Sequence, residues 1–207
     1  MNPADEIRIQ KILTLVGSHK KILDLGCGDG FLMQKIKRNN NTVFGIDIAS
    51  KALEKSQKKG LSVFDLDLNT NWSKGMEEHF DSVVAGEIIE HIFDTDLFLN
   101  NIYKVLKKNG TLILSTPNIA SLARRIMLLL GINPLIEVTA RRYDAGHIRY
   151  FTFKSLKNLL YENDFSIMHF TSDSINFDNK AFFKSKILAE IFPTFGKTLI
   201  IKAAKKI

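Results

Sequence analysis

The sequence predicts an α/β protein whose core is a doubly wound, mostly parallel sheet of seven strands. Short apolar runs alternate along the chain with amphipathic helical segments, as a parallel sheet covered by helices requires. A turn with three glycines in five positions follows the first apolar run, and glycine lets a ligand approach the backbone there. The 207 residues suffice for one sizeable core and are too few for two ordinary domains. We therefore expect a single domain over residues 1–207.

The predicted elements follow one another in a regular order. An opening amphipathic helix ends at Gly17 and carries an apolar face made of Ile9, Ile12, Leu13 and Val16. Strands are predicted over residues 21–25, 42–47, 61–64, 82–85, 111–115, 165–171 and 198–203. Helices are predicted over residues 31–38, from near Ser50 as a cap, and from near Asp94 or Thr95. The chain has no internal repeat or low-complexity segment.

The glycine-rich turn after the first strand has the composition of a nucleotide cradle. Its sequence is Asp24-Leu25-Gly26-Cys27-Gly28-Asp29-Gly30. A ligand can lie against the backbone where no Cβ intrudes and where the turn can adopt positive φ. The dinucleotide fingerprint requires glycine or alanine where this chain has Phe31, so the match to that motif is poor.

This run instead resembles motif I of the class I S-adenosylmethionine (SAM)-dependent methyltransferases, of the type 11 and type 23 groups. The resemblance implies that SAM is the cofactor and S-adenosylhomocysteine (SAH) the product. A sulfonium cofactor has no pyrophosphate, and an acid beside the turn can favour its ammonium group. The resemblance assigns cofactor contacts in this turn to Asp24, Gly26, Cys27, Gly28 and Gly30. Because Cys27 is the one cysteine and sits inside the turn, we expect it to pack and not to react.

A second strand and a third acidic segment complete the predicted cofactor site. The strand over residues 42–47 ends in Asp47, whose carboxylate can accept both ribose hydroxyls. Ile48 follows it as a further cofactor contact. In methyltransferases of this kind the adenine lies after the third strand, so Asp65 and the backbone N–H of Leu66 are predicted to bind it. We expect Asp67 to be a solvated loop carboxylate.

The resemblance continues through the fourth and fifth predicted strands, and it covers residues 20 to 118 in order. Residues 80–92 and 105–118 match the corresponding family segments, which implies that Gly86 and Glu87 also contact the cofactor. The last two predicted strands resemble the antiparallel hairpin that ends the Rossmann-like sheet of this family. The expected fold is therefore a Rossmann-like, seven-stranded sheet, mostly parallel, with an antiparallel carboxyl-terminal hairpin.

The segment Glu87-x-x-Glu90-His91 supports two interpretations. On a helix its three side chains would share a face and, with His147, could bind a divalent cation. Such a set resembles those of metal-dependent ubiquinone-pathway O-methyltransferases and of small-RNA terminal 2′-O-methyltransferases, where the cation orients and acidifies hydroxyls. Alternatively, Glu87 and His91 line the cofactor pocket and no metal binds. The sequence favours the second interpretation, because a complete ligand set requires a geometry that spacing cannot supply.

His147 is the first candidate for a general base, with His91 as the second catalytic candidate. The loop around His147 resembles the Gly-His-Ile-Arg-Phe-Phe segment of bacterial methyltransferases of cell-surface glycan and lipid pathways. A neutral imidazole can take a proton from an acceptor hydroxyl, and a histidine hydrogen-bonded to backbone is the alternative role. A substrate carboxylate or phosphate could bind to arginines of this loop, unless they form surface salt bridges; they are Arg141, Arg142 and Arg149.

Two apolar insertions, near residues 119–146 and 174–195, are predicted to flank the mouth of the site. They could form a lid over a lipid-linked substrate, an interfacial helix, or a packed or dimeric surface. The net charge of +7 is spread over the surface, which does not favour a nucleic-acid partner. No leader or spanning segment is apparent, so we expect the protein in the cytoplasm, with peripheral contact at the inner membrane face as an option.

These observations predict a SAM-dependent methyltransferase acting on a small molecule, at a hydroxyl oxygen of a glycan or lipid-pathway intermediate. One alternative is a metal-assisted O-methyltransferase of the quinone or RNA 2′-O type. A second alternative is a non-catalytic, SAM-binding regulatory subunit. The sequence leaves the acceptor and the oligomeric state open.

Overall fold

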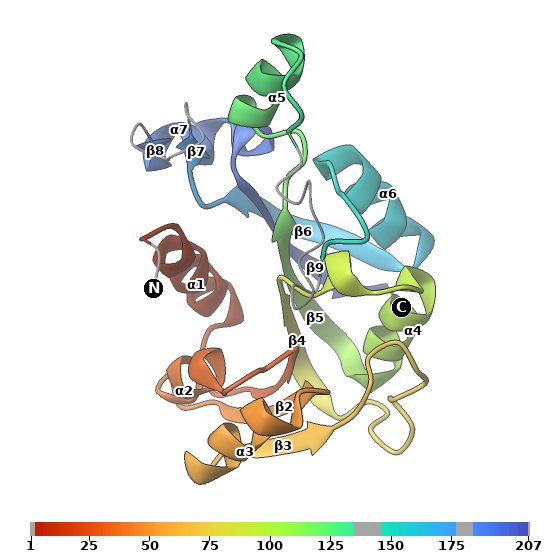
Figure 1. The fold of residues 1–207 in the computed structure, drawn as a ribbon. Helices are drawn as coiled ribbons and strands as arrows, with labels where there is room; N and C mark the ends of the chain where they lie inside the picture. Colours follow the sequence, from red (N-terminus) through yellow and green to blue (C-terminus); the bar gives the residue numbers. More distant parts are fainter. Residues whose placement is uncertain (1–2, 135–145, 177–183, 207) are drawn as a thin grey trace.

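The computed structural model describes residues 3–134, 146–176 and 184–206, and its centre is a seven-stranded sheet (Figure 1). The strands lie in the order β3-β2-β1-β4-β5-β9-β6, which is the reversing order of a doubly wound fold. The strands of this sheet are β1 Lys21–Leu25, β2 Thr42–Asp47, β3 Ser62–Asp65, β4 Phe80–Gly86, β5 Leu106–Pro117, β6 Phe165–Ser172 and β9 Thr198–Lys205. The short strands β7 Ile175–Asn176 and β8 Lys184–Ser185 form a separate pair.

The helices are α1 Pro3–Val16, α2 Phe31–Lys37, α3 Ser50–Lys58, α4 Thr95–Val105, α5 Leu122–Leu129, α6 Phe153–Glu162 and α7 Lys186–Ile191. Two 3₁₀ turns accompany them, η1 Ile89–His91 and η2 Pro193–Phe195. Figure 1 shows α1, α2 and α3 on one side of the sheet and α4 and α6 on the other. None of the helices in the described residues is long and apolar enough to cross a membrane.

The predicted fold class is confirmed, including its antiparallel end. Strands β3, β2, β1, β4 and β5 pair in parallel, and β9 pairs antiparallel with both β5 and β6. The last strand of the chain therefore lies between β5 and β6 and not at the edge of the sheet. This arrangement brings the carboxyl ends of β4, β5 and β6 to one edge, where ligands bind in open α/β sheets.

Alternating side chains of the strands build one apolar layer on each face of the sheet. On the face of α1, Ile22 and Val84 pack with Ile12 of that helix. On the opposite face, Leu23 and Phe98 belong to the second layer. Both layers are needed because a parallel sheet is covered by helices on both sides, which explains why its strands are nearly continuous apolar runs.

Two helix starts test the predicted caps. Asp94 caps α4 as expected, because its side chain accepts a hydrogen bond from the backbone N–H of Leu97 at 2.9 Å. Ser50 is not a cap, contrary to expectation: it is the first residue of α3, and Ala49 precedes the helix. The Ser50 hydroxyl instead donates to the Asp65 carboxylate at 3.3 Å, so a contact between the start of α3 and the end of β3 replaces the local cap.

Phe98→Ala is expected to lower the free energy of unfolding by about 3–5 kcal/mol, because Phe98 is fully buried between α4 and the sheet. Phe93→Ala is the matched control, since the Phe93 side chain is exposed. The control should change stability by less than about 0.5 kcal/mol. Urea denaturation of both variants measures the difference, and equal losses would contradict this assignment of the core.

Candidate active site

The turn between β1 and α2 forms an open cradle at the carboxyl edge of the sheet. Gly28 has a φ of 52°, and a Cβ built on it would meet no atom within 4 Å, so its backbone faces open space. A Cβ on Gly30 would lie 2.2 Å from Cδ1 of Leu61, which leaves no room for a side chain. The turn is thus packed against the protein at Gly30 and open to a ligand at Gly28.

Asp47, at the end of β2, holds this turn in place. Its Oδ2 accepts a hydrogen bond from the backbone N–H of Gly28 at 2.7 Å, and its Oδ1 accepts from the N–H of Ala49 at 2.8 Å. The carboxylate therefore joins the glycine turn to the start of the next helix. Each carboxylate oxygen has a further lone pair available to a ligand.

Cys27 is buried beneath the turn. A Cβ on Gly45 would lie 2.6 Å from the Cys27 sulfur, so the thiol fills the space that this glycine leaves. Burial raises the pKa of the Cys27 thiol to about 12, and the nearby Asp24 and Asp47 carboxyl groups add to the rise. A thiol with so high a pKa is a poor nucleophile, which supports the predicted packing role.

A pocket of about 290 Å³ opens beside the cradle, between the ends of β2 and β4. It is lined by Gly26, Asp47, Ile48, Leu66, Asp67, Leu68, Asn69, Ile88, His91 and Ile92. Asp65, the predicted adenine partner, is exposed, does not line this pocket and is bonded to Ser50. Asp67, expected in solvent, lines it. The pocket thus contains an aspartate two residues beyond the expected one.

Asp24 lies under the cradle with 2 % of its surface exposed. Its Oδ2 has no hydrogen-bond partner within the described part of the chain. Burial and, to a lesser degree, the Asp47 carboxylate raise the pKa of Asp24 to about 8, against the opposing effect of the Arg8 guanidinium. A buried carboxyl oxygen without a partner fits a site for a cationic group such as an amino acid ammonium.

Arg8 of α1 reaches the same edge of the sheet and was not predicted from the sequence. Its Nη1 donates to the Ser115 hydroxyl at 3.4 Å and lies 3.9 Å from Oε1 of Glu87. A Cβ on Gly86 would come within 3.4 Å of the same nitrogen. The sequence contains one signal for this role of Arg8, which is its helical spacing. Arg8 precedes the buried Ile12 by four residues, so its side chain lies on the apolar face of the helix.

Glu87 follows β4 with a φ of 56°, a left-handed conformation that is costly for a residue with a side chain. Its Oε1 accepts a hydrogen bond from the Ser115 hydroxyl at 3.0 Å. Burial raises the pKa of Glu87, while Arg8 and the Ser115 hydroxyl lower it. Gly86 and Glu87 therefore lie at the carboxyl edge of the sheet, although neither lines the pocket beside the glycine turn, and their contact with the cofactor stays a prediction.

Glu90, His91 and His147 come together at this edge, and each offers one ligand atom within 4.8 Å of the other two. Glu90 is 1 % exposed, its Oε2 accepts from the Thr116 hydroxyl at 2.9 Å, and its Oε1 lies 3.9 Å from Nε2 of His147. The ring centroids of His91 and His147 are 4.9 Å apart. Burial raises the pKa of Glu90 to about 7, helped by the Glu87 charge.

Glu87 does not belong to this cluster, because the segment is not an α-helix. Residues 89–91 form the 3₁₀ turn η1, and Glu87 precedes it with positive φ. The helical spacing that would place Glu87, Glu90 and His91 on one face is therefore absent. The structure brings together three of the four residues of the alternative metal set.

The segment after His147 is anchored to the same turn. The backbone N–H groups of Ile148 and Arg149 both donate to the carbonyl of Glu90 at 3.1 Å. The Arg149 guanidinium donates to the carbonyl oxygens of Ile92, at 3.0 Å, and Phe93. Arg149 thus binds backbone, which positions His147, while Arg141 and Arg142 lie outside the described residues.

The fold and this edge define an α/β protein with a glycine turn after the first strand and an acid at the end of the second, an arrangement typical of proteins that bind nucleoside-containing cofactors. Residues 6–169 match the family model described as a methyltransferase domain. The chain therefore belongs to the SAM-dependent methyltransferase family, and SAM is its cofactor.

Several relatives and solved structures are similar to this chain. Ubiquinone biosynthesis O-methyltransferase of Pelagibacter ubique is 35 % identical over 47 % of this chain and 42 % of the relative. The enzyme of the same name from Bartonella quintana is 29 % identical over 80 % of this chain and 68 % of the relative. A SAM-dependent methyltransferase of Thermotoga maritima, described as a possible histamine N-methyltransferase, has a TM-score of 0.69 at 18 % identity and covers 98 % of this chain and 91 % of that one. The chain matches less than half the length of the Pelagibacter relative.

Asp24→Asn is expected to weaken the dependence of stability on pH. The folded Asp24 carboxyl has a pKa of about 8, against 3.8 as the ordinary value. Between these two values the folded group keeps its proton and the unfolded group loses it, so the free energy of unfolding falls as the pH rises. Asparagine does not titrate, so the melting temperature of the variant should fall less across this window.

Thermal denaturation from about pH 4 to about pH 8 measures both slopes. Asp164→Asn, at an exposed position after α6, is the matched control and should keep the wild-type slope. Identical slopes for wild type and Asp24→Asn would contradict the raised pKa.

Proposed function

We propose that this protein transfers the methyl group of SAM to a hydroxyl oxygen of a small-molecule acceptor. In this proposal Asp47 binds the ribose hydroxyls, Asp24 and Arg8 bind the amino and carboxyl groups of the methionine part, and Gly28 lies against it. Two observations support this placement of SAM: the open space beside the backbone of Gly28, and the Oδ2 of Asp24, which has no hydrogen-bond partner among the described residues. SAM supplies an electrophilic methyl group on a sulfonium, which an oxygen attacks in line.

The observation that carries the proposal is the Glu90, His91 and His147 cluster beside the cofactor pocket. Methylation of a hydroxyl leaves a proton to remove, and this edge holds two imidazoles and a buried carboxyl group for that purpose. His91 lines the pocket beside the glycine turn, so in this proposal the cluster adjoins the cofactor. Two of the relatives compared above are named as O-methyltransferases, which supports oxygen as the acceptor atom.

The geometry favours the metal-assisted form of this chemistry over the metal-free form. Oε1 of Glu90 and Nδ1 of His91 are buried without hydrogen-bond partners among the described residues. Both atoms are metal ligands in many proteins, and a divalent cation would satisfy them. Such a cation would orient and acidify the acceptor hydroxyl. Without a cation, His147 takes the proton and the carboxyl group of Glu90 orients its ring.

The acceptor class that we propose is a lipid-pathway or glycan intermediate, with peripheral contact at a membrane. The support is the exposed apolar surface of α5 and α7, where Leu129 is 86 % exposed and Ile187 is 72 % exposed. Figure 1 shows both helices at one end of the molecule, and both contact β7. The names of the two relatives refer to ubiquinone, a lipid-soluble quinone, which agrees with an apolar acceptor.

Titration of Mg²⁺ and then Mn²⁺ into chelator-treated, SAH-saturated protein tests the metal-assisted form by calorimetry. We expect binding at one site, and loss of that binding in the double variant Glu90→Gln, His147→Gln. Glu162→Gln, His169→Gln makes the same changes at exposed positions and should bind the cation as the wild type does. Absence of wild-type binding would leave His147 as a metal-free base.

Formation of SAH from SAM in the presence of small dihydroxyphenyl acceptors tests the proposed transfer itself. In the metal-free case, His147→Ala should lower kcat by about 10²–10⁴-fold, because a general base contributes roughly that factor. SAH binding by the variant should stay close to that of the wild type. Tight SAH binding without transfer to any hydroxyl acceptor would instead favour a regulatory, SAM-binding subunit.

Leu129→Ser, Ile187→Ser is expected to reduce co-sedimentation with vesicles of phosphatidylcholine and phosphatidylglycerol, because the exposed apolar side chains of α5 and α7 would be lost. Met168→Ser removes an exposed apolar side chain of β6 and serves as the control. Vesicle binding that is the same in all three proteins would contradict a membrane contact through α5 and α7.

A further inference from the structure

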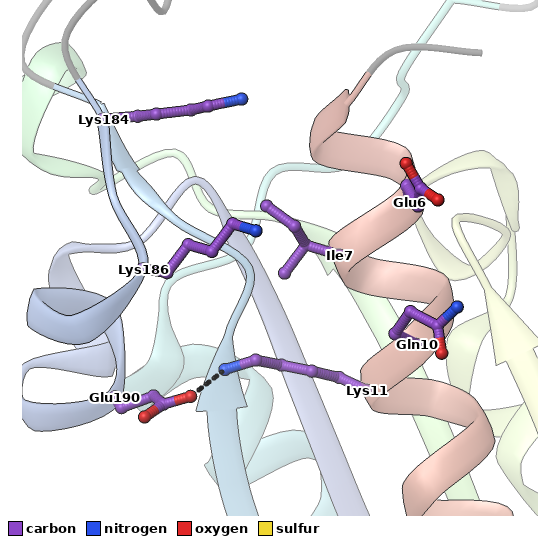
Figure 2. A pocket seen from close by; sticks show the side chains of 7 residues that line it. All are labelled: Glu6, Ile7, Gln10, Lys11, Lys184, Lys186 and Glu190. Carbon is purple, nitrogen blue, oxygen red and sulfur yellow. Dashed lines mark hydrogen bonds and ion pairs between the residues drawn. The ribbon is translucent and has the colours of Figure 1, made fainter.

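A second cleft, of about 490 Å³, lies between α1 and the β8–α7 segment (Figure 2). It is lined by Glu6, Ile7, Gln10, Lys11, Lys184, Lys186 and Glu190. None of these residues lines the pocket beside the glycine turn. The cleft is therefore a separate concave site, formed by parts of the chain that are far apart in sequence.

Three lysines give this cleft its chemistry. Figure 2 shows Lys184 and Lys186 extending towards α1, and Lys11 extending from α1 towards α7. Lys11 is mostly buried, and its Nζ donates to the Thr171 hydroxyl at 3.0 Å. Among the described residues, the ammonium groups of Lys184 and Lys186 have no hydrogen bond or ion pair. Two ammonium groups of the cleft are thus not paired with a carboxylate.

The carboxylates of the cleft do not cancel these charges. Glu190 is 3.5 Å from Nζ of Lys11, which is longer than the 2.7–2.9 Å of a strong charge-assisted hydrogen bond. Its side chain is largely exposed, so it can move away from Lys11 at little cost. Figure 2 shows the Glu6 carboxylate directed away from Lys184 and Lys186.

The sheet register relates this cleft to Arg8 at the carboxyl edge of the sheet. Ser115 of β5 is opposite Ile200 of β9, and Ile200 is opposite Thr171 of β6. Directly opposed residues of antiparallel strands point to the same face of a sheet, so these three form a row on the face of α1. Arg8 contacts the first hydroxyl of this row and Lys11 the last. Two strand spacings, about 10 Å, separate Ser115 from Thr171.

We infer that this cleft binds the anionic group of the methyl acceptor, a phosphate or diphosphate ester, through Lys11, Lys184 and Lys186. The identification of the ligand as the acceptor rests on the proposed function. Ammonium groups bind phosphate oxygens, and the row from Ser115 to Thr171 places the cleft on the same face of the sheet as Arg8. The exposed Ile187 follows Lys186 directly, so an apolar chain attached to the phosphate would meet an apolar surface.

Calorimetric titration of inorganic diphosphate into the full chain tests this inference. Lys184→Gln, Lys186→Gln should weaken binding by about tenfold or more, because it removes two charge-assisted contacts. Lys154→Gln, Lys157→Gln makes the same charge change on the exposed face of α6 and should bind as the wild type does. Glu190→Gln removes the carboxylate that competes for Lys11 and should strengthen binding severalfold.

Three outcomes would overturn the inference: no diphosphate binding by the wild type, equal weakening in both lysine pairs, or binding to phosphatidylglycerol vesicles without binding to diphosphate. The last outcome would mean that the lysines face a lipid surface and not a soluble phosphate ester. SAH affinity, measured in the same variants, should remain unchanged. A failure of SAH binding or of methyl transfer would count against the proposed function. The diphosphate titration would still decide whether the cleft binds an anion.

Discussion

The glycine turn and the pocket beside it depend on one constraint. The Asp47 carboxylate accepts hydrogen bonds from the backbone N–H groups of Gly28 and Ala49. It fixes a glycine turn that has few side chains to hold it, and it does so from the neighbouring strand. The turn is also tied to β2 by the N–H groups of Gly26 and Cys27, which share the carbonyl of Ile46. The position of the cradle is therefore set by the pairing of β1 and β2, and the pocket beside it inherits that rigidity.

Much of this architecture is predictable because it depends on local patterns. The apolar runs locate the strands, and Asp94 caps α4 as its position before an amphipathic segment suggests. The site is less predictable where long-range contacts decide. Ser50 at the start of α3 bonds to Asp65 at the end of β3, and Arg8 contacts Ser115, which is more than a hundred residues away in the sequence. The left-handed backbone of Glu87, which removes it from the Glu90 cluster, has no signal in the residue type, since positive φ is rare for glutamate.

Charge is distributed unevenly over the face that α1 covers. Three acidic groups with raised pKa values, Asp24, Glu87 and Glu90, lie near the ends of β1 and β4, where burial disfavours their ionised forms. This part of the edge suits cationic groups, such as an ammonium, a sulfonium or a divalent ion. The cleft around Lys11 lies two strands away, on the same face, and offers the opposite charge.

The central position of β9 has a consequence for the order in which the protein can be completed during synthesis. Within the part of the chain that the structure describes, the one strand that pairs with β6 is β9, which leaves the ribosome after it. Until then β6 is an unpaired edge, a state that exposes its backbone groups to other chains. The row from Ser115 to Thr171 also remains interrupted, because Ile200 is its middle member. The cofactor half of the protein can thus form early, whereas the lysine cleft can be assembled only after the last strand has been translated.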